Sequence, residues 1–210
     1  MKKSNLKRIA LVVSLAAVIG VGGSLAYFTD TDTKTNVMTL GKVEGELTET
    51  TTTDNTTTTD TGITYNDPVR PGDVLSKQPK VVLASDSEDA YARVSIVITG
   101  MNSDGTDLSA KQAEELKAIE LDINNAEGWY KGSDAYYYYN NKLTADTEAT
   151  RTTTNVFNHV YIPKTWGNEM SNITVSIKVV GQLIQADNFD SQLQYTEGHI
   201  SSWGTITDFD

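Results

Sequence analysis

The sequence predicts an all-β fold, an antiparallel β-sandwich that carries one short inserted helix. Two segments, 90–100 and 173–180, alternate apolar and polar residues, which is typical of strands with one buried face. Threonine, tyrosine, valine and isoleucine, which pack well on a pleated sheet, are abundant along the chain. Only one segment has a helical pattern, so the repeating strand–helix–strand order of a parallel sheet is missing.

The N-terminus has the pattern of a secretory signal peptide. Four basic residues fall within the first eight, an apolar run follows over 9–19, and Ser24-Leu25-Ala26 supplies the small residues of a cleavage site. We therefore predict a signal peptide over 1–26, cleaved between Ala26 and Tyr27. The alternative is an uncleaved membrane anchor. The apolar run is short for that role, because a spanning helix needs about 20 apolar residues.

The predicted signal contains four cations and no anion, so its removal takes the formal net charge from −11 to −15. Nucleic acids and anionic membranes repel such an acidic chain, and membrane contact is expected only through the signal peptide before cleavage. The protein has no cysteine, so after export its stability must come from a core and not from disulfides. The 184 residues that remain suffice for one domain, which we place at 37–210.

The first part of this domain combines a strand with a polar segment. The run from Val43 to Leu47 alternates like a strand, and Gly41 shifts its phase relative to 38–40, as a β-bulge does. Positions 48–64 are rich in threonine and lack an apolar period, which favours an exposed loop, with a frayed hairpin as a second form. A glycosylated or adhesive patch is the functional alternative for this threonine-rich loop.

Turns and strands follow. Pro68, Pro71 and Gly72 predict turns, and a strand begins around 81–83. The strand over 90–100 is the clearest in the chain, because its apolar and polar residues separate onto two faces. Its apolar face contains Ala92, Val94, Ile96 and Ile98.

A single helix is predicted over 110–119, as an insertion at 109–120 between strands. Ser109 is a good N-cap and Gln112 completes a capping box, while Leu116 and Ile119 supply an apolar side.

Four consecutive tyrosines, Tyr136–Tyr139, predict a strand with two rings on each face. We expect two of these tyrosines to lie in the core and two at the surface or an interface, and stacking on a ligand is the functional alternative. The alternating segment 173–179 supplies one of the last strands.

The sequence gives little support for catalysis. A zinc protease needs three protein ligands and a general base, commonly as H-E-x-x-H, but His159 and His199 each lack a second histidine at helical spacing. We therefore expect no enzyme, no metal and no cofactor. The acidic clusters at 30–32, 86–89 and 187–190 do not have the ligand spacing of an EF-hand. They leave a calcium- or carbohydrate-binding surface module open as an alternative.

An ordered set of motifs resembles a known family. It starts with Ala26-Tyr27-Phe28-Thr29-Asp30 and continues through Asn36, Gly41, Val43, Leu47 and Glu49. Later members of the set are Pro71-Gly72, Lys77, Pro79, Ala90–Val94, Gly128–Tyr130, Tyr137–Asn140 and Gln185–Phe189. Together they resemble the TasA/camelysin family of secreted biofilm-matrix fibre proteins, and within it the BsaA-type biofilm pilins. The signal peptides of this family resemble substrates of a dedicated signal peptidase of the SipW type.

The resemblance implies a jelly-roll sandwich and a secreted subunit of an extracellular biofilm fibre. It also implies that the N-terminal segment freed by cleavage, 27–36, adds as a strand to the sheet of the next copy. The donor residues are then Tyr27, Phe28, Thr29, Asp30, Thr31, Asp32, Thr33 and Lys34. An extended segment with threonine at every second position and no apolar face of its own can satisfy its backbone on an exposed sheet edge in this way.

Three further expectations depend on this interpretation. The partners are other copies of the chain and a signal peptidase of the SipW type, and the location is the extracellular matrix or cell surface. Lys34 and Lys42 are candidates for isopeptide cross-links between subunits. The alternatives are a monomeric adhesion or ligand-binding module at the cell surface and, since some camelysin relatives are described as metallopeptidases, a metallopeptidase.

Overall fold

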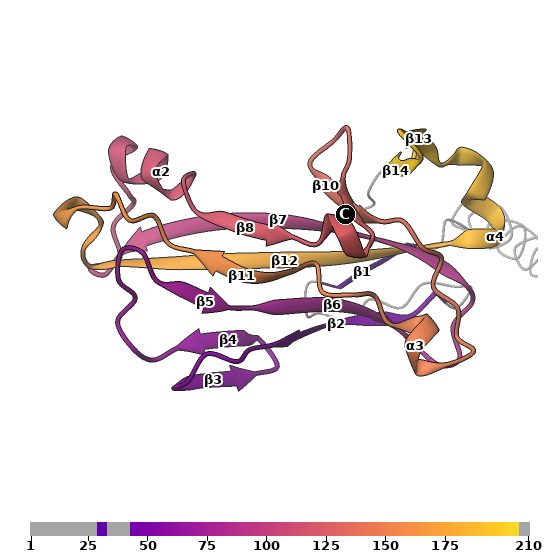
Figure 1. Ribbon diagram of the computed structural model, residues 1–210, viewed down its shortest axis with the longest axis horizontal. Helices are drawn as coiled ribbons and strands as arrows, with labels where there is room; N and C mark the ends of the chain where they lie inside the picture. The colour runs from indigo at the N-terminus through magenta and orange to yellow at the C-terminus, as the bar shows by residue number, and fades with distance from the viewer. Residues whose placement is uncertain (1–28, 33–42, 206–210) are drawn as a thin grey trace, which may run out of the picture.

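The computed structural model describes residues 29–32 and 43–205, and within them the predicted antiparallel, jelly-roll-like β-sandwich is confirmed (Figure 1). One layer is a five-stranded sheet in the order β1-β12-β7-β10-β9, and all its neighbouring strands are antiparallel. Its strands are β1 (Thr29–Asp32), β7 (Ala90–Asn102), β9 (Trp129–Lys131), β10 (Tyr136–Tyr139) and β12 (Ile173–Gln185).

The second layer joins a three-stranded and a two-stranded sheet. The first has the order β5-β11-β8 and the second pairs β2 with β6. Their strands are β2 (Gly45–Thr50), β5 (Val74–Ser76), β6 (Gln78–Leu83), β8 (Glu120–Ile123) and β11 (Phe157–Tyr161). The amide of Val156 donates to the Pro79 carbonyl at 2.8 Å, and the amide of Lys77 donates to the Asn158 carbonyl at 2.9 Å. These bonds connect the two sheets side by side into one layer.

The main core lies between the layers, and the long strands β7 and β12 supply much of it. They pair without interruption over thirteen residues, from Ile173↔Asn102 to Gln185↔Ala90. The predicted inward face of β7 is confirmed, since Ala92 and Val94 are fully buried and Ile96 and Ile98 pack against the core. Trp129, Leu83 and Phe157 fill its centre without exposure to solvent.

The inserted helix is confirmed as α2 (Ala110–Leu116), with the capping box between Ser109 and Gln112 in place. It ends at Leu116, three residues before the predicted end, because the chain turns there to enter β8; Ile119 is still buried. Two further single turns, α3 (Glu148–Arg151) and α4 (Ala186–Phe189), are too short for the sequence pattern to predict. Among the described residues, no helix is long and apolar enough to cross a membrane.

Of the two forms predicted for the threonine-rich segment over 48–64, the structure has the hairpin, and the exposed loop is wrong for most of its length. β2 extends to Thr50, and β3 (Thr56–Thr59) pairs with β4 (Gly62–Tyr65). The hairpin projects from the sandwich below β5 in Figure 1. Because most of its threonines are exposed, it has no apolar period, and composition alone does not distinguish it from a loop.

Two of the four tyrosines of β10, Tyr138 and Tyr139, are buried, as expected, and the other two are half-buried against a core and not at the surface. Tyr137 and Tyr139 face the main core, while Tyr136 and Tyr138 belong to a second cluster on the opposite face. That cluster is covered by the C-terminal segment, which contains α4, η3 (Asp190–Gln192), β13 (Gln194–Thr196) and β14 (His199–Ser202). It includes Ile184, Phe189, Leu193, Ile200 and Trp203. Two opposed cores therefore enclose β10.

Burial of tyrosine predicts a loss of stability in alkali. Burial is the main cause that raises the pKa of Tyr65 and of Tyr138 from the usual 10.0 to about 12. Since the folded state holds these protons more tightly than the unfolded chain, their contribution is present below pH 10 and is lost as the pH rises to about 12. We expect the urea midpoint to fall over this interval while tyrosinate absorbance rises. A Tyr195→Phe variant at an exposed position should leave the fall unchanged. An unchanged midpoint in the parent protein would contradict the prediction.

Candidate functional site

Part of the predicted donor segment forms a strand on the protein's own sheet. Thr29–Asp32 is β1, which pairs antiparallel with β12 in the register Thr29↔Ile184 to Asp32↔Gly181. The predicted donor segment is therefore compatible with β-structure, and the edge that receives it in the single chain is the C-terminal part of β12. The remaining predicted site residues lie outside the described part of the chain: Ala26, Tyr27, Phe28, Thr33, Lys34 and Lys42.

β1 covers only a small part of the β12 edge. β12 has thirteen residues, of which β1 pairs with the four at 181–184. On this side of β12, no strand of the described chain pairs with the eight residues at 173–180. In Figure 1, β1 accordingly lies beside only the right-hand part of β12. Where no strand pairs with it, the edge of a strand presents a row of backbone donors and acceptors.

The open part of β12 has one half-buried apolar face and one polar face. Ile173, Val175 and Ile177 are partly buried and pack against the main core. On the outer face, Thr174, Ser176 and Lys178 are exposed. An extended segment that paired here would find apolar side chains on its inner side and hydroxyl groups on its outer side.

At the β1 end of this edge, two glycines allow the layers to approach closely. A Cβ atom at Gly45 in β2 would lie 2.4 Å from Leu183 Cδ1 and 2.7 Å from the Val82 carbonyl oxygen. One at Gly181 in β12 would contact Val81 at 3.4 Å and Leu47 at 3.6 Å. β2, the edge strand of the second layer, is thus held against β12 at this end of the sandwich.

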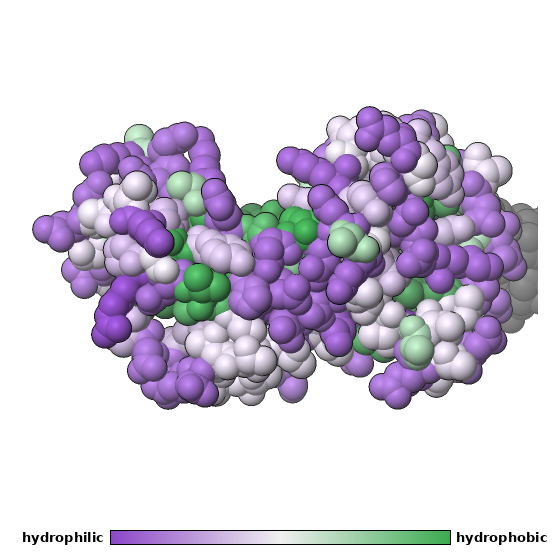
Figure 2. Space-filling view, in the orientation of Figure 1, coloured by the Kyte–Doolittle hydropathy of each residue, from purple (hydrophilic) through white to green (hydrophobic). Residues whose placement is uncertain are grey.

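The opposite side of the sandwich has a second, shorter open edge. β10 pairs with β7 only at 93–95, so the part of β7 from Ile96 onwards has no strand beside it on that side among the described residues. Figure 2 shows a hollow with hydrophobic residues at its base over the middle of the molecule, between the α2 end and the C-terminal end. Ile96 and Ile98 of β7 and Leu121 and Ile123 of β8 are partly buried and pack against the main core.

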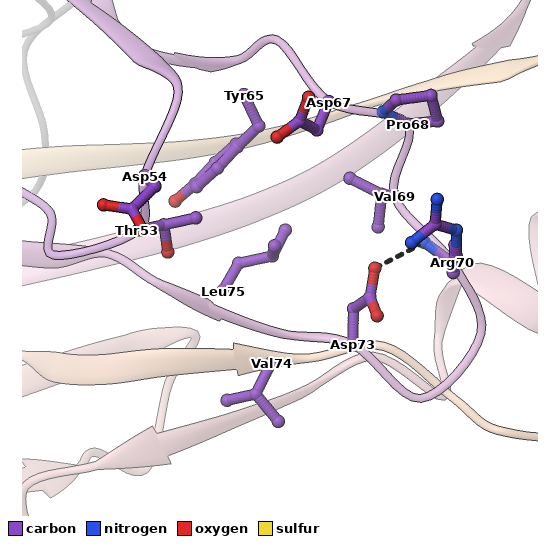
Figure 3. A pocket seen from close by; sticks show the side chains of 10 residues that line it. All are labelled: Thr53, Asp54, Tyr65, Asp67, Pro68, Val69, Arg70, Asp73, Val74 and Leu75. Carbon is purple, nitrogen blue, oxygen red and sulfur yellow. Dashed lines mark hydrogen bonds between the residues drawn. The ribbon is translucent and has the colours of Figure 1, made fainter.

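A cleft lies at the base of the β3–β4 hairpin (Figure 3). It has a volume of about 260 Å³ and is lined by Thr53, Asp54, Tyr65, Asp67, Pro68, Val69, Arg70, Asp73, Val74 and Leu75. The Tyr65 hydroxyl donates to the Ser76 carbonyl at 2.7 Å, which fixes the ring. Asp67 accepts from Asn55 and Asp73 accepts from the Arg70 amide, both at 2.7 Å. No sequence pattern predicts this cleft, because it depends on how the hairpin packs against residues 67–75.

The residues considered for catalysis or metal binding do not come together. His159 lies in β11 with its Nδ1 2.8 Å from Asp122, while His199 lies in β14 with its ring stacked on Tyr130 at 3.4 Å. Partial burial raises the pKa of the Asp122 carboxyl, but hydrogen bonds from His159 and Asn158 outweigh it and hold this pKa below its usual value. Within the described ranges, no three His, Cys, Asp or Glu side chains are grouped so as to hold a metal.

The acidic clusters at 86–89 and 187–190 both act on Lys142. Asp89 binds Lys142 at 2.9 Å, and this hydrogen bond is the main cause that raises the pKa of Lys142. Asp187 and Asp190 also act on Lys142 through their charges. The cluster at 30–32 falls on β1, and its side chains lie outside the described part of the molecule.

Comparisons with known proteins leave the family undetermined. No family model matches the chain, and no curated protein or solved structure matches it either. The resemblance to biofilm fibre proteins therefore remains a prediction from the sequence motifs.

Proposed function

We propose that the protein is a secreted structural subunit of an extracellular matrix fibre, exported through the signal peptide at 1–26. Copies assemble when the N-terminal segment of one copy, freed by cleavage after Ala26, adds as a strand to the sheet of the next. The partner is thus another copy of the same chain, and assembly needs no catalysis, metal or cofactor.

The observation that carries this proposal is the pairing of Thr29–Asp32 with β12. It supports the view that the segment is compatible with a strand and that this sandwich has an edge compatible with it. Strand addition gives affinity through backbone hydrogen bonds. When donor and acceptor are different surfaces of one chain, the contact is heterologous and extends into a filament.

Deletion of Tyr27–Lys34 from the mature protein is the direct test. We expect the mature protein to form fibres in negative-stain electron microscopy and the truncated protein to remain unassembled, because it has no strand to donate. Circular dichroism must show that the truncated protein keeps its β-structure. Normal fibres from the truncated protein would refute strand donation.

A pair of matched variants of the same length separates backbone pairing from side-chain contacts. Asp30→Pro/Thr31→Pro removes two successive backbone donors, one of which faces the partner strand whatever the register. Asp30→Ala/Thr31→Ala changes the same side chains and keeps both donors. We expect fibres from the alanine variant and none from the proline variant. If both variants assembled equally, backbone pairing by this segment would not be the basis of the fibre.

A further inference from the structure

The edge of β12 matches the predicted donor segment in length. The predicted donor Tyr27–Lys34 has eight residues, and the open part of β12 over 173–180 also has eight. Among the described residues, the segment pairs with its own chain at the four positions of β1.

The open part of β12 also lacks the features that protect sheet edges. Such edges are usually shielded by a bulge, a proline, several charges or a short length. The β12 register with β7 is continuous, so this part of the strand has no bulge. It contains no proline and only one charged residue, Lys178. Five of its eight residues are valine or isoleucine, which favour strands.

The edges at β9, β8 and β7 are less suitable. β9 has three residues and β8 has four, two of which are the acidic Glu120 and Asp122. The open part of β7 is bordered by β10 at one end and by α2 at the other (Figure 1). On β12, β1 is the described strand that borders the open part, and β1 must itself leave when it is donated.

We propose that Ile173–Val180 of β12 is the acceptor edge for the N-terminal segment of a neighbouring copy. The incoming strand pairs there and covers the half-buried side chains of Ile173, Val175 and Ile177. The acceptor's own β1 is released to pair in the same way with the next copy. This inference rests on the proposed function and adds the surface on which the donated strand lies.

Disulfide trapping tests the assignment, since the chain has no cysteine of its own. The donor is the mature protein with one cysteine, placed in turn at Thr29, Asp30, Thr31 and Asp32. The recipient is the protein without 27–34, which cannot donate, with one cysteine at Thr174, Ser176 or Lys178. We expect a disulfide-linked heterodimer on a non-reducing gel, because adjacent strands bring paired Cα atoms within the roughly 4.4–6.8 Å that a disulfide spans.

Thr99→Cys in the recipient is the matched control. Thr99 is paired with Ser176 and lies on the same exposed face, but on β7, one strand farther from the incoming segment. This adds roughly 4.8 Å, which puts it out of disulfide reach. We expect cross-linking at Ser176 to exceed that at Thr99 by about tenfold or more.

The outcomes separate the two proposals. If fibres need Tyr27–Lys34 but cross-links form equally at Thr99 and Ser176, or at none of the three β12 positions, the acceptor assignment is wrong and strand donation stands. Cross-links to a cysteine at Gln182 alone would also overturn it, since the neighbour would then occupy the place of β1. If the truncated protein assembles by itself, strand donation fails, whatever the cross-links show.

Discussion

Replacing Glu49 with leucine is expected to lower the free energy of unfolding by about 3–5 kcal/mol. Lys77 Nζ lies 2.6 Å from Glu49 Oε2, and the two side chains are only 7% and 11% exposed. The pair connects β2 to the junction between β5 and β6. Removing the carboxylate leaves a buried ammonium without its partner, and burying an uncompensated charge is costly. Equilibrium unfolding in urea measures the loss.

Two further variants show whether the lost stability comes from the buried ammonium group that has no partner. The double variant Lys77→Met/Glu49→Leu removes both charges and keeps most of the volume, so it should recover most of the stability lost in Glu49→Leu. Lys117→Met breaks the Lys117–Glu114 pair, whose side chains are 71% and 72% exposed. It should cost less than about 1 kcal/mol. If the double variant were as unstable as Glu49→Leu, the loss would instead reflect poor packing at this position.

The parts of the fold that sequence predicted well are those in which one face is buried and the other is exposed. β7 and β12 show this, since each has an apolar inner face along a continuous ladder. The helix was predicted because its signal is local, with Ser109 and Gln112 three residues apart. Alternation and capping are read from neighbouring residues, so neither depends on the rest of the chain.

The errors arose where the environment of a segment is set by distant residues. Tyr136 and Tyr138 face a second core because the segment from α4 to Trp203, more than forty residues further on, covers them. The Lys77–Glu49 pair and the hairpin cleft depend in the same way on contacts between elements. No periodicity within β10 or the hairpin carries this information.

The candidate site was predicted only in part, for the same reason. The alternating threonines of 29–35 predicted an extended segment, and Thr29–Asp32 is a strand. Its partner residues, 181–184, are about 150 positions away, and which of several strands remains open at the edge follows from the whole sheet order. Only the structure identifies the stretch of β12, 173–180, beside which no described strand lies on this side.

The second core contains large aromatic residues and should therefore contribute strongly to the stability of the fold. The Trp203→Ala variant tests this. Trp203 is 1% exposed, its ring lies 4.1 Å from the Arg93 guanidinium carbon, and it meets the Tyr138 ring edge-on at 6.0 Å. Truncation leaves a large cavity and uncovers buried Arg93, so we expect a loss of about 3–5 kcal/mol in the free energy of unfolding. A loss below about 1 kcal/mol would show that the C-terminal segment is not part of the cooperative fold.

Phenylalanine at the two buried tryptophans gives a sharper comparison. Trp129 donates from Nε1 to the Thr154 carbonyl at 3.1 Å, whereas Trp203 Nε1 is buried and has no hydrogen-bond partner among the described residues. Trp129→Phe therefore leaves a carbonyl without its donor, while Trp203→Phe removes a donor that was already unpaired. Since both changes remove the same volume from a buried site, we expect Trp129→Phe to be more destabilising by about 1–3 kcal/mol. Equal losses in urea unfolding would mean that Trp203 Nε1 has a partner in solution. Circular dichroism of the aromatic bands shows which core a substitution affects. Trp203→Phe should alter the signal of the tyrosines on the outer face of β10 and leave the signal of the main core unchanged.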